Sequence, residues 1–401
     1  MALPTPTAKT AMAPGPQGAS PAPANLPAIP FIRASRKKSA LVTTLTNVPT
    51  TTQITLAAAQ IRPAGFLARI RLVVTGTTAG NAAAVTFAPD APFNILQQIG
   101  FISPAGDTIM STLDGFSLFV LNKYGAFGSG TRDPLADPTY SVVAGAGATG
   151  GSFKFMLDIP VEIDSRDAFC TLQNMAANQQ FILQMSLNTL ANVYGVAPTT
   201  APNVVIVAVM EYYSAPNATN GDGYPQATTP QGNGSLSLIQ IQTPPIVANT
   251  TQNLQLINVG NTIRAQFFVL RTAAGVRTEV DWPTVFNVYV NNDLYFYKQK
   301  DLWRSQMAVE YQYRAGITAA PTLNGLDAGV FVLTDFMNSG SQGGMQVNGA
   351  SNRNLFLVTG SGTGFNIEAG TPWGAAAGSL LAITNAIKPA NAQSLYAVEP
   401  Y

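Results

Sequence analysis

A chain of 401 residues has room for two or three domains, and 46% of its residues are apolar, which is ample for their cores. Only 10% are charged, against about a quarter in a typical soluble protein, so we expect much of the outer surface to be buried against other protein molecules. The chain has one cysteine, Cys170, and no histidine, which excludes an intrachain disulfide and, in practice, a zinc site. We therefore expect a buried, unreactive thiol at Cys170, and we expect no metal, no cofactor and no catalytic residue.

The first 38 residues are rich in Pro, Ala and Thr, and they end in a basic cluster formed by Arg33, Arg36, Lys37 and Lys38. No acidic residue occurs in the first 89 positions, which carry eight positive charges and leave −7 for the rest of the chain. Frequent proline predicts an arm that is extended or disordered until a partner holds it. A basic arm suits an anionic surface, either lipid headgroups or nucleic acid; the alternative is a solvated tail that keeps the protein soluble. Its prolines interrupt any signal-peptide core, and the aliphatic runs of the chain are too short for a membrane-spanning helix.

Beyond the arm, the sequence has the texture of β-strands. Large apolar side chains alternate with other residues at 153–163, 181–187 and 286–290, as half-buried strands require. Turn residues at 103–107 and 291–293 each separate two apolar runs and predict two hairpins. Many short strands with Gly and Pro turns favour an all-β protein.

One helix is predicted at 301–314, where Trp303, Met307 and Tyr311 recur every fourth residue. A composition break at 214–234 has almost no aliphatic residues, so it reads as a linker or an exposed loop. The halves on either side of this break resemble each other, because Gly65–Val74 matches Gly260–Val269 at an offset of 195. Two copies of one β domain are the simplest explanation.

The layout of most of the chain, most clearly from Gly65 to Asp167, resembles the double jelly-roll major capsid proteins of tectiviruses, which are tailless bacteriophages with an internal membrane. The resemblance implies an all-β fold of two fused antiparallel eight-stranded jelly rolls, a double jelly roll, with few short helices and an extended N-terminal arm. The segments that carry it are structural: Gln98–Pro104, Ala144–Gly150, Asp158–Val161 and Gly329–Asp335. Together with the composition break, it predicts a basic arm at 1–38, a first jelly roll at 39–213, a linker or loop at 214–234 and a second jelly roll at 235–401.

The resemblance also implies a structural function. Members of that family form homotrimers with a pseudo-hexagonal outline, and these capsomers tile an icosahedral shell around an internal membrane. The expected partners are other copies of the chain, neighbouring capsomers, and minor capsid and vertex proteins, in a virion whose proteins are made in the host cytoplasm. By resemblance the arm lies on the inner side, where Arg33, Arg36, Lys37 and Lys38 face anionic lipid, and no specific nucleic-acid recognition is expected. Long loops such as 214–234 are expected on the outer surface.

The arm departs from the family, whose best-known N-terminus is rich in Gln and Ala and prone to form a helix. This one is punctuated by proline, which puts its conformation in doubt but leaves its basic character unchanged.

Two other function classes remain open. A β-sandwich adhesin or carbohydrate-binding fibre protein would share the β texture but would not need a basic arm without acidic residues. A glycoside hydrolase would need paired carboxylates, and the densest acidic cluster is formed by Asp158, Glu162, Asp164 and Asp167. We expect the first three on one strand face, as a solvated edge or an intersubunit contact. The three tryptophans are expected to be core anchors rather than sugar-stacking platforms.

Overall fold

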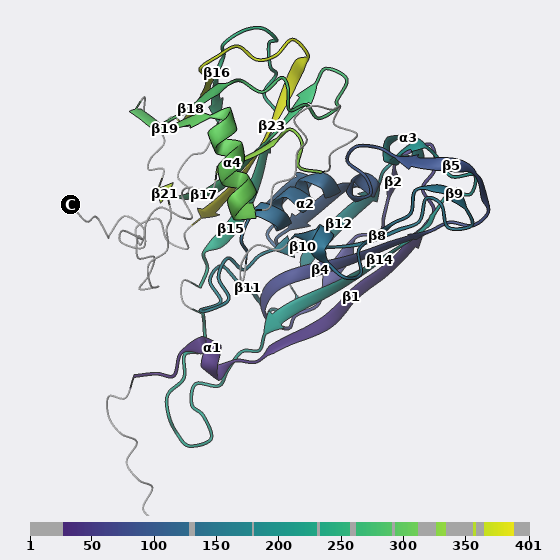
Figure 1. Ribbon diagram of the computed structural model, residues 1–401. Helices are drawn as coiled ribbons and strands as arrows, with labels where there is room; N and C mark the ends of the chain where they lie inside the picture. The colour runs from purple at the N-terminus through teal and green to yellow at the C-terminus, as the bar shows by residue number, and fades with distance from the viewer. Residues whose placement is uncertain are drawn as a thin grey trace, which may run out of the picture.

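The computed structural model describes residues 27–127, 133–178, 180–230, 233–256, 262–290, 293–311, 326–333, 356–357 and 365–388. These residues form layered, mainly antiparallel sheets (Figure 1). The strands before residue 214 and those after residue 234 repeat the same arrangement, and each set is described in turn.

The first sheet of the N-terminal half has the strand order β1-β14-β4-β10-β8 and is antiparallel throughout. Buried and partly exposed side chains alternate along most of β4 and β10, so one face of the sheet covers a core and the other faces away from it. The strands are β1 (Lys37–Asn47), β14 (Asn203–Tyr213), β4 (Gly65–Thr77), β10 (Phe153–Pro160) and β8 (Ser141–Val142), with β11 (Leu172–Asn174) paired to the start of β4.

The opposite layer of this half consists of β2 and β3 beside β12, followed by β6 and β7. With β2 and β3 counted together as the second strand, the layers read 1-8-3-6 and 2-7-4-5 in chain order, which is a jelly roll. The strands of this layer are β2 (Ile54–Thr55), β3 (Ala59–Ile61), β12 (Phe181–Leu187), β6 (Leu96–Ile102) and β7 (Thr108–Leu113). A small sheet at one end is formed by β5 (Asn81–Phe87), β9 (Gly145–Gly147) and β13 (Tyr194–Val196).

The C-terminal half repeats this topology. Its layers have the orders β15-β23-β17-β20 and β16-β22-β18-β19, which again read 1-8-3-6 and 2-7-4-5. The first layer is formed by β15 (Leu236–Gln242), β23 (Ala377–Lys388), β17 (Thr262–Thr272) and β20 (Val330–Leu333), with β21 (Phe356–Leu357) at the start of β17. The second is formed by β16 (Asn253–Leu256), β22 (Phe365–Ala369), β18 (Val285–Val290) and β19 (Asp293–Gln299).

The two halves share one continuous sheet. The last strand of the β2-β12-β6-β7 layer, β7, lies parallel to β15 of the second half, and Met110 is opposite Ile239. This contact extends the β2-β12-β6-β7 layer directly into the β15-β23-β17-β20 layer. The halves are therefore fused through backbone pairing as well as through side chains.

Helices are few and short among the described residues. Two are long enough to matter for packing: α2 (Gly115–Tyr124) follows β7, and α4 (Lys300–Tyr311) follows β19. The others are α1 (Phe31–Ala34), α3 (Leu190–Val193) and the 3-10 turns η1 (Phe93–Ile95) and η2 (Pro134–Ala136). None of the helices in the described residues is both long and apolar enough to cross a bilayer.

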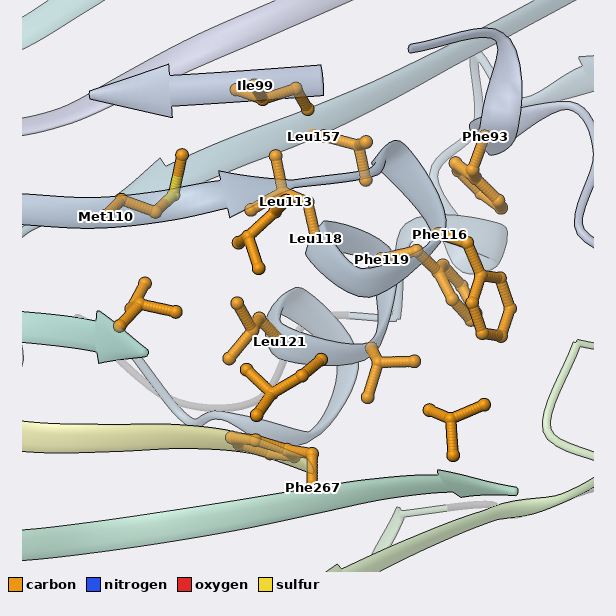
Figure 2. Close-up of a cluster of buried hydrophobic side chains, with 14 of the residues drawn as sticks. Phe93, Ile99, Met110, Leu113, Phe116, Leu118, Phe119, Leu121, Leu157 and Phe267 are labelled. Atoms are coloured by element: carbon orange, nitrogen blue, oxygen red, sulfur yellow. The ribbon is translucent and has the colours of Figure 1, made fainter. Parts of the chain in front are cut away.

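The helix α2 lies between the two halves and packs against both. Its Phe119 stacks on Phe93 at 4.6 Å between ring centroids in the first half, and Leu121 lies on the side that faces Phe267 of β17 (Figure 2). Nine of its ten residues are buried, and the apolar contacts around it join both halves into one core. Burial of this helix fixes how the halves meet.

Several sequence predictions are confirmed. The hairpins are β6–β7 and β18–β19, although residues 291–292 lie outside the described part of the chain. The predicted helix is α4, and its residues 312–314 also lie outside that part. The three tryptophans are buried, as are the Cys170 side chain and the inward-facing residues of β10. One prediction was wrong, because the strand expected to run to residue 163 ends at Pro160. The helix α2 was missed.

Candidate functional site

The end of the N-terminal arm is attached to the first half of the molecule. The backbone N–H of Ile29 donates to the carbonyl of Pro225 at 2.9 Å, and the N–H of Ala227 donates back to Ile29 at 2.9 Å. Next to these bonds, Phe31 is buried against the rings of Phe66 and Tyr213, with centroids 5.1 and 6.1 Å away. Phe31 is therefore an apolar anchor for the arm, and the basic cluster follows it within a few residues.

The four predicted basic residues lie at the same end of the molecule but not in the same environment. Arg33 is in α1, Arg36 precedes β1, and Lys37 and Lys38 begin β1. All four are exposed. Lys37 lies 3.5 Å from Glu211 and 3.7 Å from Glu162, whereas the other three form no ion pair with a described residue. The charge available to a partner thus comes mainly from Arg33, Arg36 and Lys38.

The loop between β14 and β15 lies beside this end. It contacts the arm through Gln226, which bridges to Ile29, and through Ser214, whose hydroxyl accepts from the N–H of Arg36 at 3.0 Å. Figure 1 shows this loop next to α1, projecting from the same end of the first half. The expectations of an inner arm and of an outer loop at 214–234 are therefore incompatible, because the two segments are hydrogen-bonded to each other.

The predicted acidic cluster does not form one strand face, which corrects the sequence analysis. The side chain of Asp158 accepts from Arg71 at 3.0 Å and from Arg69 at 3.3 Å. Asp164 lies beyond the end of β10 and pairs with Arg166 at 2.8 Å. Neither is a free carboxylate on a solvated edge, because β10 ends at Pro160 and each group already has a cationic partner.

Glu162 of the same cluster is buried. One oxygen of its carboxylate, Oε1, accepts from the Tyr213 hydroxyl at 2.6 Å, while the other, Oε2, accepts no hydrogen bond from a described residue. Burial raises the pKa of Glu162, and the Tyr213 hydroxyl with the charges of Lys37 and Arg69 offsets this only in part. The arrangement joins the start of β1 to the end of β14, where Lys37 lies 3.7 Å from Glu162 and 3.5 Å from Glu211.

Buried ion pairs also join the two halves at their junction. The Lys123 ammonium group of α2 is 2.7 Å from Asp327, which also accepts from the Tyr124 hydroxyl at 2.7 Å. Both Lys123 and Asp327 are almost fully buried. This pairing links α2 to the segment that precedes β20, so it orients one half against the other.

A second group of ion pairs is formed by Asp90 and two arginines of the C-terminal half. Arg271 lies 2.7 Å from one carboxylate oxygen, and Arg277, which has no exposed side-chain surface, binds the other oxygen. Arg277 also donates to the carbonyl of Pro89 at 2.7 Å. Burial raises the pKa of Asp90, but the charges of Arg271 and Arg277 outweigh it and hold the pKa below its usual value.

A cavity of about 460 Å³ opens at this junction and is lined by residues of both halves, including Asp90, Asp114, Asn188 and Arg271. Asp90 and Arg271 are paired with each other, and Asp114 caps α2 by accepting from the N–H of Ser117 at 2.8 Å. Among the described residues, no group of three or more His, Cys, Asp or Glu side chains is placed to hold a metal ion. Asp90, Arg271 and Asp114 therefore each make a structural contact at this junction.

No family model matches this sequence, and no curated protein matches it. Solved structures do. The crystal structure of the STIV major capsid protein matches with a TM-score of 0.61 at 13% identity, over 90% of this chain and 100% of that chain. The atomic structure of Sulfolobus Turreted Icosahedral Virus matches with a TM-score of 0.57 at 13% identity, over 90% and 94%. The PBCV-1 virus capsid matches with a TM-score of 0.50 at 10% identity, over 88% and 93%.

The chain has a double jelly-roll fold. The strand orders of both halves and the coverage of these structures agree on this point. The predicted fold class is confirmed, and so is the resemblance at the level of fold. The bounds predicted for the individual domains remain a prediction.

Sequence reasoning missed the residues that hold this double jelly roll together. Phe31 is one of these residues. It was missed because a single aromatic residue in a proline-rich stretch gives no periodic signal. The pairs of Asp90 with Arg271 and of Lys123 with Asp327 span more than 180 residues of sequence, and no local pattern links them. The available hint was the near absence of other charges, since a charge in so apolar a chain usually needs a partner.

Proposed function

We propose that this chain is the major capsid protein of an icosahedral virus and acts by self-assembly. The observation that carries the proposal is the double jelly roll itself, with two repeated halves fused through the β7–β15 contact. The solved structures that match it over most of the chain are capsid proteins of viruses. The scarcity of charged residues supports the same function, because a shell protein buries much of its surface against neighbours.

In this proposal three copies form a capsomer with a pseudo-hexagonal outline, since each chain supplies two similar jelly rolls. A closed three-fold ring satisfies every heterologous contact and leaves no open end. The capsomers then tile a shell around an internal membrane, with minor capsid and vertex proteins as further partners. The protein is made in the host cytoplasm and resides in the virion.

The arm end of the molecule faces inward in this proposal. Arg33, Arg36 and Lys38 are exposed beside an anchored segment, so they can approach an anionic lipid surface without breaking an ion pair to any described residue. Each basic side chain near such a surface contributes about 1 kcal/mol. One copy binds weakly, and the many copies of a shell supply avidity. The loop at 214–234 lies at the same inner end.

The test is the native mass of the purified protein, measured by light scattering after size exclusion, followed by electron microscopy of the peak. We expect a species of three times the chain mass of 42.1 kDa, with particles of six-lobed outline. A monomer would contradict the proposal, and a dimer would contradict it as well, because neither can supply six similar jelly rolls.

A further inference from the structure

The helix that follows β7 shows how one jelly roll of this chain binds the next. It inserts Phe119 into the core of the first half, and its opposite side lies over β17 and β23 of the second half (Figure 2). On that sheet, Phe267 and Ile383 are paired neighbours and neither has any exposed surface. Phe268, one residue further along β17, points into the core of the second half, where its ring lies 5.4 Å from Phe286.

The helix that follows β19, α4, occupies the same place in the second half. Its Trp303 and Met307 enter the core, and the Trp303 indole donates to the carbonyl of Val332 on β20 at 2.8 Å. Within the described part of the chain, no strand covers the opposite side of α4 as β17 covers α2. Leu302 is 72% exposed and Val309 is 84% exposed, which is unusual for two aliphatic side chains on one helix face.

The first half has the matching surface. The outward face of its first sheet corresponds to the face of β17 and β23 that α2 covers, and at its centre Val73 lies opposite Val207. Both valines are only partly buried, in contrast to Phe267 and Ile383. Val205 and Val209 extend the apolar strip on β14. One half thus has a covered sheet face, and the other has an equivalent face that is partly exposed.

The edges of the sheets also match in pairs, as their faces do. In the chain, β7 at the end of one layer pairs with β15 at the start of the next. Among the described strands, the equivalent edges pair on one side only: β19 pairs with β18, and β1 pairs with β14. Both edges expose aliphatic or aromatic side chains, with Leu41 of β1 at 56% and Tyr297 of β19 at 61%.

Charged side chains near both surfaces are already paired within the chain. On α4, Asp301 lies 3.3 Å from Arg304. On the outward face of the first sheet, Arg69 and Arg71 pair with Asp158 and Glu211. Apolar side chains therefore supply the surface that a partner would cover.

We propose that the outer face of α4 and the free edge of β19 bind the outward face of the first sheet and the edge of β1 in a second copy of this chain. The contact between copies repeats the contact that α2 and β7 make with the second half inside each chain. The inference rests on the proposed capsid function and names the surfaces that build the capsomer. Three such contacts close the ring, because each copy supplies one α4 face and one sheet face.

Cysteine cross-linking tests the contact. Val309 and Val207 are changed to cysteine in one chain (V207C/V309C) and treated with a short bismaleimide; the native Cys170 is buried. We expect covalent trimers on a denaturing gel. Each single variant alone should stay uncross-linked, and a mixture of the two single variants should yield covalent dimers. The matched control is V196C/V309C, because Val196 is 45% exposed and lies on β13 rather than on the first sheet.

The outcomes separate this inference from the proposed function. Covalent trimers of V207C/V309C, with no product from the control pair, support the contact. A wild-type trimer by light scattering without any cross-link in V207C/V309C overturns the contact and leaves the capsid function standing. A wild-type monomer overturns both. As an independent variant, L302D/V309D should shift the trimer to monomer with an unchanged circular dichroism spectrum, whereas V196D should remain trimeric.

Discussion

At the scale of single residues, the few charged side chains are placed so that most have a specific partner. A buried carboxylate is expensive unless it is paired and hydrogen-bonded. Asp90 and Asp327 meet this requirement, with two cationic or hydroxyl partners each. Glu162 meets it incompletely, because its Oε2 accepts no hydrogen bond from a described residue. Replacing the carboxylate by a neutral amide should therefore change the stability in opposite directions at Asp90 and at Glu162.

Asp90→Asn should destabilise the protein at neutral pH. The change leaves the fully buried Arg277 without its counter-charge, and loss of one partner from a buried pair costs about 3–5 kcal/mol. Because the pKa of Asp90 is lowered in the folded state, its contribution is present above the ordinary aspartate pKa and is lost as pH falls through the folded value. Urea midpoints should therefore differ strongly at pH 7 and converge in strong acid.

The control for this prediction is Asp222→Asn, because Asp222 is exposed in the loop after β14. Its midpoint should match that of the wild type at every pH. Equal midpoints for Asp90→Asn and the wild type at pH 7 would show that the pair with Arg271 and Arg277 contributes nothing to stability.

Glu162→Gln should have the opposite effect. The amide oxygen of Gln can still accept from the Tyr213 hydroxyl, and the buried charge is removed. Since the pKa of Glu162 is raised by burial, its stabilising contribution is complete below the ordinary glutamate pKa and is lost as pH rises through the folded value. The variant should therefore have a higher urea midpoint than the wild type at pH 7, and the gain should vanish near pH 4.

The exposed Asp107, in the turn between β6 and β7, supplies the control, and Asp107→Asn should leave the midpoint unchanged at both pH values. A lower midpoint for Glu162→Gln at pH 7 would mean that the ion pair with Lys37, at 3.7 Å, outweighs the burial of the charge.

At the scale of elements, the sequence reveals structure where one face differs from the other. The strand β10 and the helix α4 were predictable because their polar and apolar residues alternate with the period of a strand or a helix. The helix α2 was not predictable in this way, because it is buried on nearly all sides and its apolar residues are not confined to one face. Its one local signal is the N-cap, where Asp114 accepts from the N–H of Ser117 at 2.8 Å.

The internal repeat was predicted in position but not in register. Gly65–Val74 lies in β4, and the described part of the second segment, 262–269, lies in the corresponding strand β17. The offset of 195, however, pairs Leu72 with Phe267. Leu72 lies on the buried face of β4, whereas Phe267 faces α2 (Figure 2). A bulge between Ile263 and Ala265 accompanies this one-residue difference, which reverses every side chain after it.

Truncation of the arm should have two distinct effects, depending on where it ends. Removal of residues 1–26 leaves the Ile29 and Phe31 contacts intact, so the thermal midpoint should stay within about 1 °C of the wild type. Removal of residues 1–38 deletes Phe31 and the first residues of β1, and it exposes Phe66 and Tyr213. Loss of a buried Phe side chain costs about 3–5 kcal/mol in a core, so this midpoint should fall by several degrees.

The point variant Phe31→Ala separates the anchor from the rest of the arm. Amide hydrogen exchange should accelerate at Ile29 and Ala227, whose N–H groups bond across the arm and loop, while the amides of β4 stay protected. Unchanged exchange at Ile29 and Ala227 would show that Phe31 does not hold the arm in place.

At the scale of the whole molecule, the pattern of short strands and turns limits the fold to a few β architectures, and the resemblance to double jelly-roll capsid proteins selects one of them. What the sequence could not specify is which ends of the strands meet. The arm and the loop at 214–234 are separated by almost 200 residues, yet Ile29 bridges to Gln226. Neither segment has a periodic apolar pattern from which this contact could be predicted. The contact fastens the segment just before the basic cluster, so Arg33, Arg36, Lys37 and Lys38 lie at one end of the first half.

The molecule should therefore bind anionic membranes through that end, and the affinity should rise with the number of arms in one assembly. The variant R33E/R36E/K38E reverses three charges that form no ion pair with described residues, and it should keep the wild-type native mass and thermal midpoint. In flotation assays, wild-type trimers should bind vesicles containing anionic phospholipid, bind neutral vesicles far less, and lose binding as salt rises. With about 1 kcal/mol for each basic side chain, the variant should lose at least a hundredfold in vesicle affinity.

Lys37 provides the internal comparison for this experiment. It already lies near Glu162 and Glu211, so Lys37→Gln should reduce vesicle binding less than Lys38→Gln. Equal binding of R33E/R36E/K38E and the wild type would remove the arm from the membrane contact. Binding to single-stranded nucleic acid with comparable salt dependence, but not to vesicles, would instead place the genome opposite this end, because both surfaces present the same array of phosphates to the same three side chains.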